Sequence, residues 1–461
     1  MKKKVLICFS HNHYIRNYLL TNAFDELEKK FECFYIADYS TISEKSKILL
    51  KNKNNFLGYF DIDKNIRDIH GQIFEIHLFR YFFKSKSFSQ RIRVRFNLHL
   101  VDSFKKPFIL TPFRILLRYY RGLKRFIIRW PYSFLSFFET FEHIMYNKIP
   151  PNSKILKYIK DIKPNLVLIP TSATDIGGID CVRICNDENI NSMYLVDNWD
   201  NLSSKIIIRF KPDCIATWGQ QTLEHAEKIQ GINKNSCKII GTARYDQYFK
   251  KRHENLKSNF DFKYILFLGT SHRFNEEEVI VKLNHLIDNN QKFKDIKIVY
   301  RPHPWRQGEQ TFFNNLKNVI MDPDIMGVFN DNENDYNSPN QEYYPSLLKN
   351  CEFVVGGIQS MMIETAIFGK IFLALIHDDK KNVSSMHNVF KRYEHFKGVE
   401  KIESMIFCDN IEDLENKFNE SWKNKNSVDL KKIDQQRNHI LYNDEKSYQT
   451  RLTELINQLL E

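Results

Sequence analysis

The sequence of 461 residues lacks the cysteine patterns of metal- or disulfide-stabilised proteins. It has eight cysteines, and no two of them form a CxxC pair. Cys181 and Cys185 are four residues apart, which is the spacing of neighbours on one face of a helix. We therefore expect no zinc or disulfide framework, and the pattern favours a reducing, cytoplasmic environment.

The sequence also lacks long apolar segments and an excess of acidic residues. No stretch approaches 18 apolar residues without a charge, so no membrane-spanning helix is expected. The N-terminal stretch "MKKKVLICFS" begins like a signal peptide, but its apolar run is too short and no small-residue cleavage site follows. Lysine and arginine outnumber aspartate and glutamate by 68 to 56. The resulting charge of +12 favours anionic partners.

Short apolar runs alternate with helical patterns along most of the chain, as in the βαβ units of a parallel sheet. The first series of strands is expected at 4–10, 33–38, 165–172, 192–197, 214–219 and 237–246. The second series is expected at 264–271, 296–302, 318–322, 351–357, 371–376 and 404–409. Helices are expected at 14–30, 177–189, 220–230, 275–289 and 444–460.

These elements predict an α/β protein with two Rossmann-like, doubly wound sheets in tandem. The first domain is expected at 1–245 and the second at 262–440. The hinge should fall near 240–262, which is charged and weakly patterned. Residues 441–461 are expected to contain a helix that could cross back to the first domain.

Residues 40–150 do not fit the strand pattern and are expected to form an insertion in the first domain. Within it, 84–130 contains thirteen Lys or Arg and one Asp, interleaved with aromatic residues. We expect 84–137 to be largely helical. Its basic and aromatic side chains could contact an anionic membrane surface. Alternatively, the apolar face packs internally and the basic face is solvated. Nucleic-acid binding is not favoured, because no recognised motif supports it.

Three strand ends of the second half carry residues that suit an anionic ligand, and ligands of open α/β sheets bind beyond the carboxyl ends of strands. In the first, Gly269 allows close approach, and Thr270 and Ser271 could donate to a phosphate. In the second, "YRPHPW", His303 stands between two prolines beside Arg301. Proline fixes the backbone here, so a stiff turn is the alternative explanation.

The third strand end, "CEFVVGGIQSMMIETAIFGK", places Gln359 and Ser360 at the start of a helix. Ser360 could donate to a phosphate oxygen, and Glu364, one turn further on the same face, could reach ribose hydroxyls. A simple N-cap and a surface charge are the corresponding alternatives.

The stretch "RPHP" followed by "GGIQSMMIETAIFGK" resembles GT-B glycosyltransferases of bacterial surface polysaccharides. The resemblance is to the group with an HP motif and a downstream Ser motif, which includes bacterial sialyltransferases, capsule Kdo transferases and CDP-glycerol glycerophosphotransferases. "IIGTARYDQY" also resembles a stretch that precedes the nucleotide domain in such proteins. The resemblance covers roughly 165–376.

The resemblance implies a GT-B fold, in which two Rossmann-like domains face a cleft, with the acceptor bound by the first domain and the nucleotide donor by the second. It also implies that His303 and Ser360 bind the donor phosphate and that Glu364 holds the ribose. It also implies a metal-independent reaction without a cofactor. Gln359-Ser360 replaces the paired serines of the group, which leaves the exact donor open. "DPD" at 322–324 has a proline inside it, so we interpret it as a turn rather than a metal-binding DxD motif.

The acceptor side is expected in the first half, where "VDNWDNLSSK" ends a strand. Trp199 could stack on a sugar ring beside Asn198, and Asp200 or Asp197 could accept a hydroxyl proton. The alternative is an Asx-rich turn.

The stretch "SHNHY" supplies His13 and His11 as rival bases, with His11 otherwise a candidate acceptor contact. "TSATD" adds Thr171, Ser172 and Asp175 at the next strand end.

Together these features predict a cytoplasmic glycosyltransferase that builds a surface glycan, such as a capsule, from a nucleotide-activated donor. A CMP-sugar is slightly favoured as donor, and a glycan or lipid-linked molecule is the expected acceptor. Peripheral attachment to the inner face of the cytoplasmic membrane is left open. The alternatives are transfer of a polyol phosphate from a CDP-polyol, and a non-catalytic nucleotide-sugar-binding or membrane-scaffold subunit of a polysaccharide assembly complex.

Overall fold

The structure is a computed structural model, and its described residues form two compact units. It describes residues 2–81, 85–92, 126–205, 208–272, 274–306, 315–325, 343–380 and 385–461, with single positions at 94, 116, 120, 123 and 124. Unit 1 comprises Met1–Asp246, Tyr393–His395 and His439–Glu461. Unit 2 comprises Gln247–Arg392 and Phe396–Asn438.

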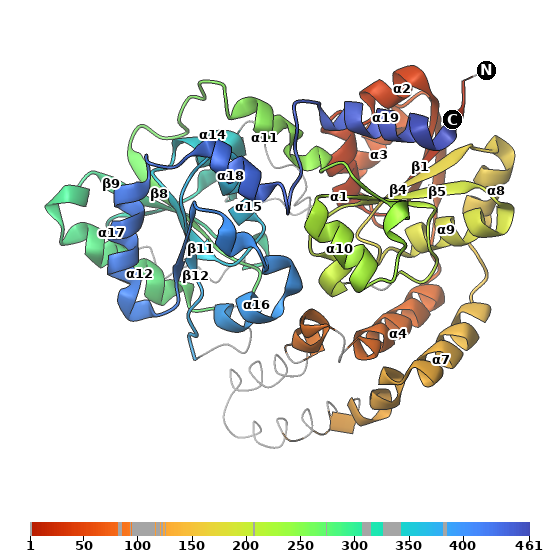
Figure 1. The fold of residues 1–461 in the computed structure, drawn as a ribbon, viewed down its shortest axis with the longest axis horizontal. Helices are drawn as coiled ribbons and strands as arrows, with labels where there is room; N and C mark the ends of the chain where they lie inside the picture. Colours follow the sequence, from red (N-terminus) through yellow and green to blue (C-terminus); the bar gives the residue numbers. More distant parts are fainter. Residues whose placement is uncertain are drawn as a thin grey trace. The chain divides into compact units, whose positions relative to one another are not determined.

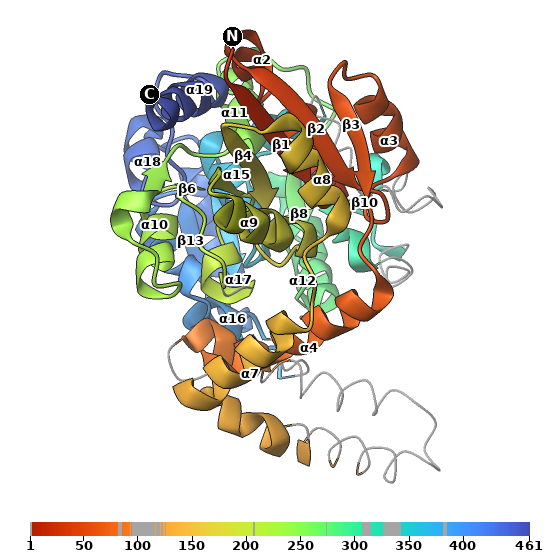
Figure 2. The same cartoon turned by 90° about the vertical axis from the view of Figure 1, so that its right-hand side faces the viewer.

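Within the described residues, unit 1 contains a parallel sheet of seven strands. In spatial order these are β3 (Phe56–Phe60), β2 (Glu32–Asp38), β1 (Lys4–Phe9), β4 (Leu166–Thr171), β5 (Asn191–Val196), β6 (Cys214–Thr217) and β7 (Cys237–Ile239). The central strands are buried on both faces, which is why β1 and β4 are continuous apolar runs. Figure 2 shows β1, β2 and β3 side by side.

Helices cover both faces of this sheet. They are α1 (Asn12–Tyr14), α2 (Asp25–Lys30), α3 (Glu44–Lys51), α8 (Ser153–Ile162), α9 (Ile176–Glu188), α10 (Gln220–Lys228) and the C-terminal α19 (Tyr448–Leu460). One core cluster joins the sheet to α2 and α19, which lie next to each other in Figure 1. A second cluster joins the other face to α8, α9 and α10. The last helix of the chain, α19, therefore packs against the sheet of unit 1.

Two elements of unit 1 differ from the sequence prediction. β3 lies inside the range 40–150, where no strand was expected, so the excursion from the sheet begins only after Phe60. β3 is a short strand at the edge of the sheet. A Cβ on its Gly58 would lie 2.7 Å from Tyr158 Oη, so a larger side chain at this position would collide with Tyr158. The predicted helix 14–30 is broken into α1, the π-helical turn η1 (Ile15–Leu19) and α2, with Asn22 in the left-handed region at φ 59°.

The described part of the insertion contains α4 (Lys64–Arg80) and α7 (Leu135–Asn147), which contact each other. Much of the predicted helical range 84–137 lies outside the described residues. The described positions at 86–92, 116, 120, 123–124 and 126–129 are helical. Among the residues that the structure describes, no helix is long and apolar enough to cross a bilayer.

In unit 2, the described ranges contain a parallel sheet of six strands. Their order is β10 (Val319–Met321), β9 (Ile296–Arg301), β8 (Lys263–Leu268), β11 (Val354–Gly357), β12 (Phe372–Leu375) and β13 (Met405–Cys408). The helices are α11 (Asp246–Lys251), α12 (Glu276–Asp288), α14 (Tyr343–Asn350), α15 (Met361–Ile367), α16 (Met386–Arg392), α17 (Leu414–Asn424) and α18 (Leu430–Arg437). Because β8 lies between β9 and β11, the loops after these three strands emerge side by side at one edge.

Candidate functional site

In unit 2, the loop after β8 packs closely against the His-Pro turn after β9. The Gly269 amide donates to the Arg301 carbonyl at 2.8 Å. A Cβ on Gly269 would lie 2.9 Å from both His303 N and Pro302 Cα. Glycine is therefore required here by the close approach of two backbones. The predicted contact of Gly269 with a ligand stays a prediction.

Glu276, which the sequence analysis did not single out, holds these two loops together. It lies in the first turn of α12 and is 3% exposed. Its carboxylate accepts from Thr270 N at 3.0 Å and from Tyr300 Oη at 2.7 Å, and it pairs with Arg306 Nη1 at 2.9 Å. The acidic run "NEEE" directly after the loop was the available signal. The strand-end geometry thus depends on one buried carboxylate.

His303 is half-buried at the end of β9. Burial, followed by the charges of Arg306 and His272, lowers its pKa to about 4. Its backbone carbonyl accepts from Arg306 N at 2.8 Å, which closes the turn. At neutral pH the imidazole is therefore uncharged, so that one ring nitrogen can donate a hydrogen bond and the other can accept one.

Arg301 differs from its predicted role as a donor-phosphate ligand. It is 6% exposed and forms ion pairs with Asp322 and, at 3.0 Å, with Asp324. Its guanidinium lies 4.2 Å from the ring centroid of Tyr344. The two carboxylates of the "DPD" stretch therefore compensate this charge inside unit 2.

The carboxyl end of β11 approaches β8 equally closely. A Cβ on Gly356 would lie 2.6 Å from the Leu268 carbonyl oxygen, and one on Gly357 would lie 2.9 Å from Thr270 Cγ2. Gln359 Nε2 donates to that same Leu268 oxygen at 3.1 Å. Strand order and glycine contacts thus bring the three predicted strand ends to one edge.

The predicted polar ligands at this edge differ in accessibility. Ser360 is half-buried, and its side chain makes no capping hydrogen bond at the start of α15. Ser271 is exposed. The Thr270 hydroxyl donates to the His272 carbonyl at 2.6 Å, and Thr270 and Glu364 are both 1% exposed. His303, Ser360 and Ser271 are therefore the better placed candidates for ligand contact.

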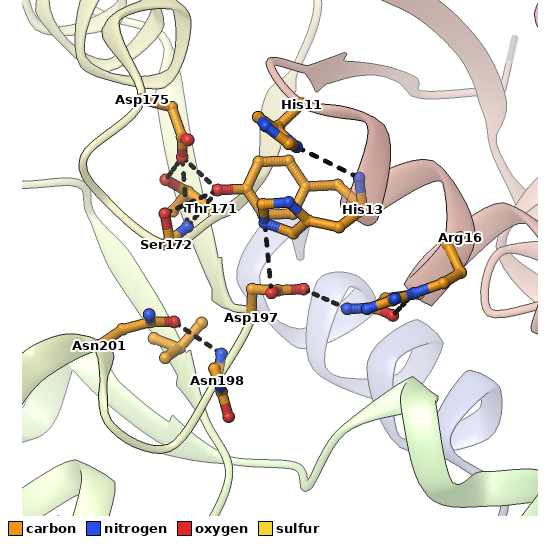
Figure 3. Close-up of polar contacts among 12 residues, drawn as sticks. His11, His13, Arg16, Thr171, Ser172, Asp175, Asp197, Asn198 and Asn201 are labelled. Carbon is orange, nitrogen blue, oxygen red and sulfur yellow. Dashed lines mark hydrogen bonds and ion pairs between the residues drawn. The ribbon is translucent and has the colours of Figure 1, made fainter. Parts of the chain in front are cut away.

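In unit 1, His13 and Asp197 meet at the carboxyl ends of β1 and β5. His13 Nε2 lies 3.5 Å from Asp197 Oδ2 (Figure 3). Asn17 Nδ2 donates to the other carboxylate oxygen at 2.8 Å, and Arg16 Nε donates to Asn17 Oδ1 at 2.9 Å. Arg16 and Asn17 lie on the π-helical turn η1, and such turns are frequent at functional sites.

The environment moves the pKa values of this pair in opposite directions. Burial raises the pKa of Asp197, although Asn17 and Arg16 oppose the shift. Burial lowers the pKa of His13 to about 2, with further contributions from His11 and Arg16. His13 is therefore neutral, and Asp197 accepts a proton more readily than an ordinary aspartate. This combination suits a general base.

His11 lies beside His13, with ring centroids 4.2 Å apart, and its Nδ1 accepts from His13 N at 3.4 Å (Figure 3). The neighbouring strand end is closed by Tyr14, whose hydroxyl donates to Asp175 Oδ2 at 2.5 Å. Thr171 Oγ1 donates to the same oxygen at 2.6 Å. Thr171 and Asp175 thus shape the loop, and the half-buried Ser172 remains the more accessible of the three.

Asp200 and Trp199 occupy a different environment from the one expected for an acceptor site. Asp200 forms an ion pair with Lys205 at 3.1 Å. Burial favours a higher pKa for Asp200, but the charges of Lys205 and His395 outweigh it and lower the pKa. Trp199 is 2% exposed and packs edge-on against His395 at 5.2 Å. The side chain of Asn198 accepts from Trp199 N at 3.0 Å. This loop therefore holds the segment Tyr393–His395 within unit 1, and Asp197 is better suited than Asp200 to act as a base.

In the described part of the chain, no group of three or more His, Cys, Asp or Glu side chains is arranged to hold a metal ion. The parallel order of both sheets and their covering helices define the GT-B fold.

Solved structures with this fold resemble the chain over nearly its whole length. UDP-GlcNAc 2-epimerase from Methanocaldococcus jannaschii has a TM-score of 0.53 at 12% identity, covering 99% of both chains. A Listeria monocytogenes protein assigned as a UDP-N-acetylglucosamine 2-epimerase has a TM-score of 0.58 at 11% identity, covering 100% of this chain and 97% of that one. MnaA from S. aureus, solved with UDP, has a TM-score of 0.52 at 13% identity and covers 99% and 97%. No family model matches the sequence, and no curated protein matches it at a significant level.

Proposed function

We propose that the protein is a GT-B glycosyltransferase that transfers a sugar from a nucleotide-activated donor to a glycan or lipid-linked acceptor. The proposal rests on one observation, the convergence of Gly269, His303, Gly357, Gln359 and Ser360 at one edge of the unit 2 sheet. These residues belong to the motifs that resemble the HP-motif and Ser-motif group. The Rossmann-like sheet of unit 2 supplies the usual location for a nucleotide, beyond the carboxyl ends of its strands.

The donor phosphate is proposed to bind at this edge of unit 2. A phosphate leaving group gains negative charge as its bond to the sugar breaks. The neutral imidazole of His303 and the hydroxyl of Ser360 would donate hydrogen bonds to that charge, and Ser271 could add a third. Because Glu276 positions the loop after β8, these donors would need little reorganisation during the reaction.

The acceptor is proposed to bind beside His13 and Asp197 of unit 1. The acceptor hydroxyl oxygen forms a bond to the anomeric carbon, the bond from that carbon to the phosphate oxygen breaks, and the hydroxyl proton passes to the Asp197 carboxylate. Asn17 keeps that carboxylate oriented through its 2.8 Å hydrogen bond. The raised pKa of Asp197 brings its basicity closer to that needed at neutral pH.

Three other functions would use the same residues differently. A CDP-polyol phosphotransferase would transfer the phosphate with the polyol and yield a phosphodiester. A nucleotide-sugar epimerase, the activity in the names of the structural neighbours, would change the sugar without an acceptor. A non-catalytic subunit would bind nucleotide and release no product. The nature of the product therefore separates all four.

The first experiment is a thermal-shift series with CMP, CDP, UDP and GDP on the wild type and on His303→Ala and Ser360→Ala. We expect a cytidine nucleotide to stabilise the wild type most and both variants less. The preferred nucleotide then defines the donor to be incubated with glycan acceptors, with the product analysed by mass spectrometry. Absence of a shift with every nucleotide, or shifts unchanged in both variants, would remove the basis of the proposal.

A further inference from the structure

Exposed apolar side chains are concentrated in one part of the described structure. Of eleven large hydrophobic residues that are well exposed there, eight lie between 116 and 144. They include Leu116, Tyr120, Ile127, Ile128, Phe134 and Phe137. A soluble surface ordinarily carries such residues singly, and a group of them marks an interaction site.

The helix α4, which precedes this part of the chain, and α7, which lies at its end, are joined to each other and to the rest of unit 1. α4 and α7 lie side by side (Figure 1 and Figure 2). Between them, His77 Nε2 lies 2.9 Å from Glu142 Oε1, and both side chains are buried. Arg209, which follows β5 in the chain, pairs with the other oxygen of Glu142 at 3.2 Å. The contact between α4 and α7 is thereby connected to the rest of unit 1.

The inward and outward faces of the segment before α7 are distinct. Phe126 packs against Phe79 with ring centroids 5.6 Å apart and belongs to a small core with Phe88 and Ile92. Ile127 and Ile128, the next two residues, are 61% and 56% exposed. Internal packing therefore accounts for Phe126, but it does not account for its two neighbours.

The charge of this part of the sequence indicates which kind of partner could bind the apolar group. The sequence of 84–130 carries thirteen Lys or Arg and one Asp, and the described Lys124, which is exposed, lies within the apolar group. A second copy of this chain would present the same positive charge and be repelled. An anionic lipid surface would attract it, with about 1 kcal/mol for each Lys or Arg near the headgroups.

We propose that the apolar group between 116 and 144 is a membrane-docking surface for anionic lipid bilayers. Ile127, Ile128, Phe134 and Phe137 enter the boundary between headgroups and acyl chains, and the exposed Lys124 contacts the headgroups. None of its residues is assigned to the candidate sites at the strand ends, so docking and catalysis can be tested independently.

The test is vesicle flotation of the full-length protein with two vesicle compositions, phosphatidylcholine alone and phosphatidylcholine with phosphatidylglycerol. We expect the wild type to float with the anionic vesicles and less with the neutral ones. Raising the salt from about 0.1 M to about 1 M should weaken the binding, because the screening length falls from about 10 Å to about 3 Å. The double substitution Ile127→Glu and Ile128→Glu should reduce the bound-to-free ratio at least tenfold, through lost apolar insertion and added repulsion.

The matched control is Ile48→Glu in α3, since Ile48 is also 61% exposed but lies outside the group. It should float like the wild type, and all variants should keep the wild-type melting temperature. Three outcomes would overturn the proposal: equal or absent flotation of the wild type with both vesicle types, equal loss in Ile48→Glu, or a dimer in light scattering that Ile127→Glu dissociates. The last outcome would assign the surface to self-association.

Discussion

The carboxyl edges of the two sheets are built from different chemical groups. The edge of unit 1 gathers titratable side chains in mutual contact, with His13 3.5 Å from a buried Asp197 and the ring of His11 4.2 Å from that of His13. The edge of unit 2 gathers glycines, hydroxyls and one neutral histidine, and its charged residues are paired among themselves. The first arrangement suits proton transfer, and the second suits the binding of a group that brings its own charge.

The difference also shows in how each edge is held together. In unit 2, Glu276 joins two loops, and glycines allow backbones to approach within contact distance. In unit 1, Asn17 and Tyr14 orient the carboxylates of Asp197 and Asp175 through their side chains. Substitutions in unit 1 should therefore affect chemistry most, and substitutions in unit 2 should affect binding and stability.

The largest effect is expected for Asp197→Asn. Asparagine keeps the shape of the side chain but cannot take the acceptor proton, so turnover should fall about 10²- to 10⁴-fold. Nucleotide affinity should stay within about threefold, because the phosphate is assigned to unit 2. Single-turnover rates and calorimetric titration measure the two quantities. Normal turnover of the variant, or a loss of nucleotide affinity as large as the loss of turnover, would contradict the assignment of the base to unit 1 and of the phosphate to unit 2.

His303→Ala should lower kcat/KM about 10- to 150-fold. This corresponds to the loss of a hydrogen bond to a charged group, about 1.5–3 kcal/mol. Because Ser360 is assigned to the same phosphate, the double variant with Ser360→Ala should lose less than the sum of the two single losses. The control is His285→Ala, an exposed histidine of α12. If His303 were only a turn residue, its replacement would lower the melting temperature and leave turnover intact.

Glu276→Gln tests how unit 2 is held together. The substitution removes the charge that faces Arg306 and disturbs the contacts to Thr270 and Tyr300. We expect the free energy of unfolding to fall by about 2 kcal/mol, with weaker nucleotide binding. Glu277→Gln, at the exposed neighbouring position, serves as the control. Equal denaturation midpoints for the two variants would contradict the role of Glu276.

The pH dependence of stability should show whether the half-buried His303 is neutral in the folded protein. Its pKa is lowered from 6.5 to about 4, so between these values the unfolded chain binds a proton that the folded protein does not. Stability therefore falls as the pH drops through this range. Relative to His303→Gln, the wild type should lose about 2–3 kcal/mol between pH 6.5 and pH 4, because each unit of pKa difference corresponds to about 1.4 kcal/mol. Parallel stability curves from chemical denaturation would show that the imidazole has the same pKa in the folded and unfolded states.

Asp200→Asn should have the smallest effect. The sequence pattern favours Asp200 as the base, whereas the structure pairs it with Lys205 and places it beside the segment Tyr393–His395. Turnover should change less than about threefold, and the free energy of unfolding should fall by about 1 kcal/mol. Loss of turnover without loss of stability would indicate that Asp200, and not Asp197, is the base.

The agreement between predicted and observed strands has a simple physical cause. Strands of a parallel sheet are buried on both faces, so they are continuous apolar runs that the sequence displays directly. Twelve of the expected strands correspond to observed ones, from β1 to β13. β3 escaped notice because an edge strand is only half-buried and Gly58 interrupts it. The break between α1 and α2 escaped notice because the left-handed Asn22 and the π-helical turn leave no clear period in the sequence.

The sequence by itself determined the two parallel sheets of the α/β fold, the strand ends that carry the candidate site residues and the basic aromatic character of the insertion, because these follow from local patterns of burial and charge. Only the tertiary structure decided which of those residues are accessible to a ligand and which are engaged in contacts within the protein. It paired Arg301 with Asp322 and Asp324, buried Trp199 against His395, and joined His13 to Asp197 across more than 180 positions of the chain. Such pairings depend on how distant segments pack, and the distance between two side chains in space is not encoded in their spacing along the sequence.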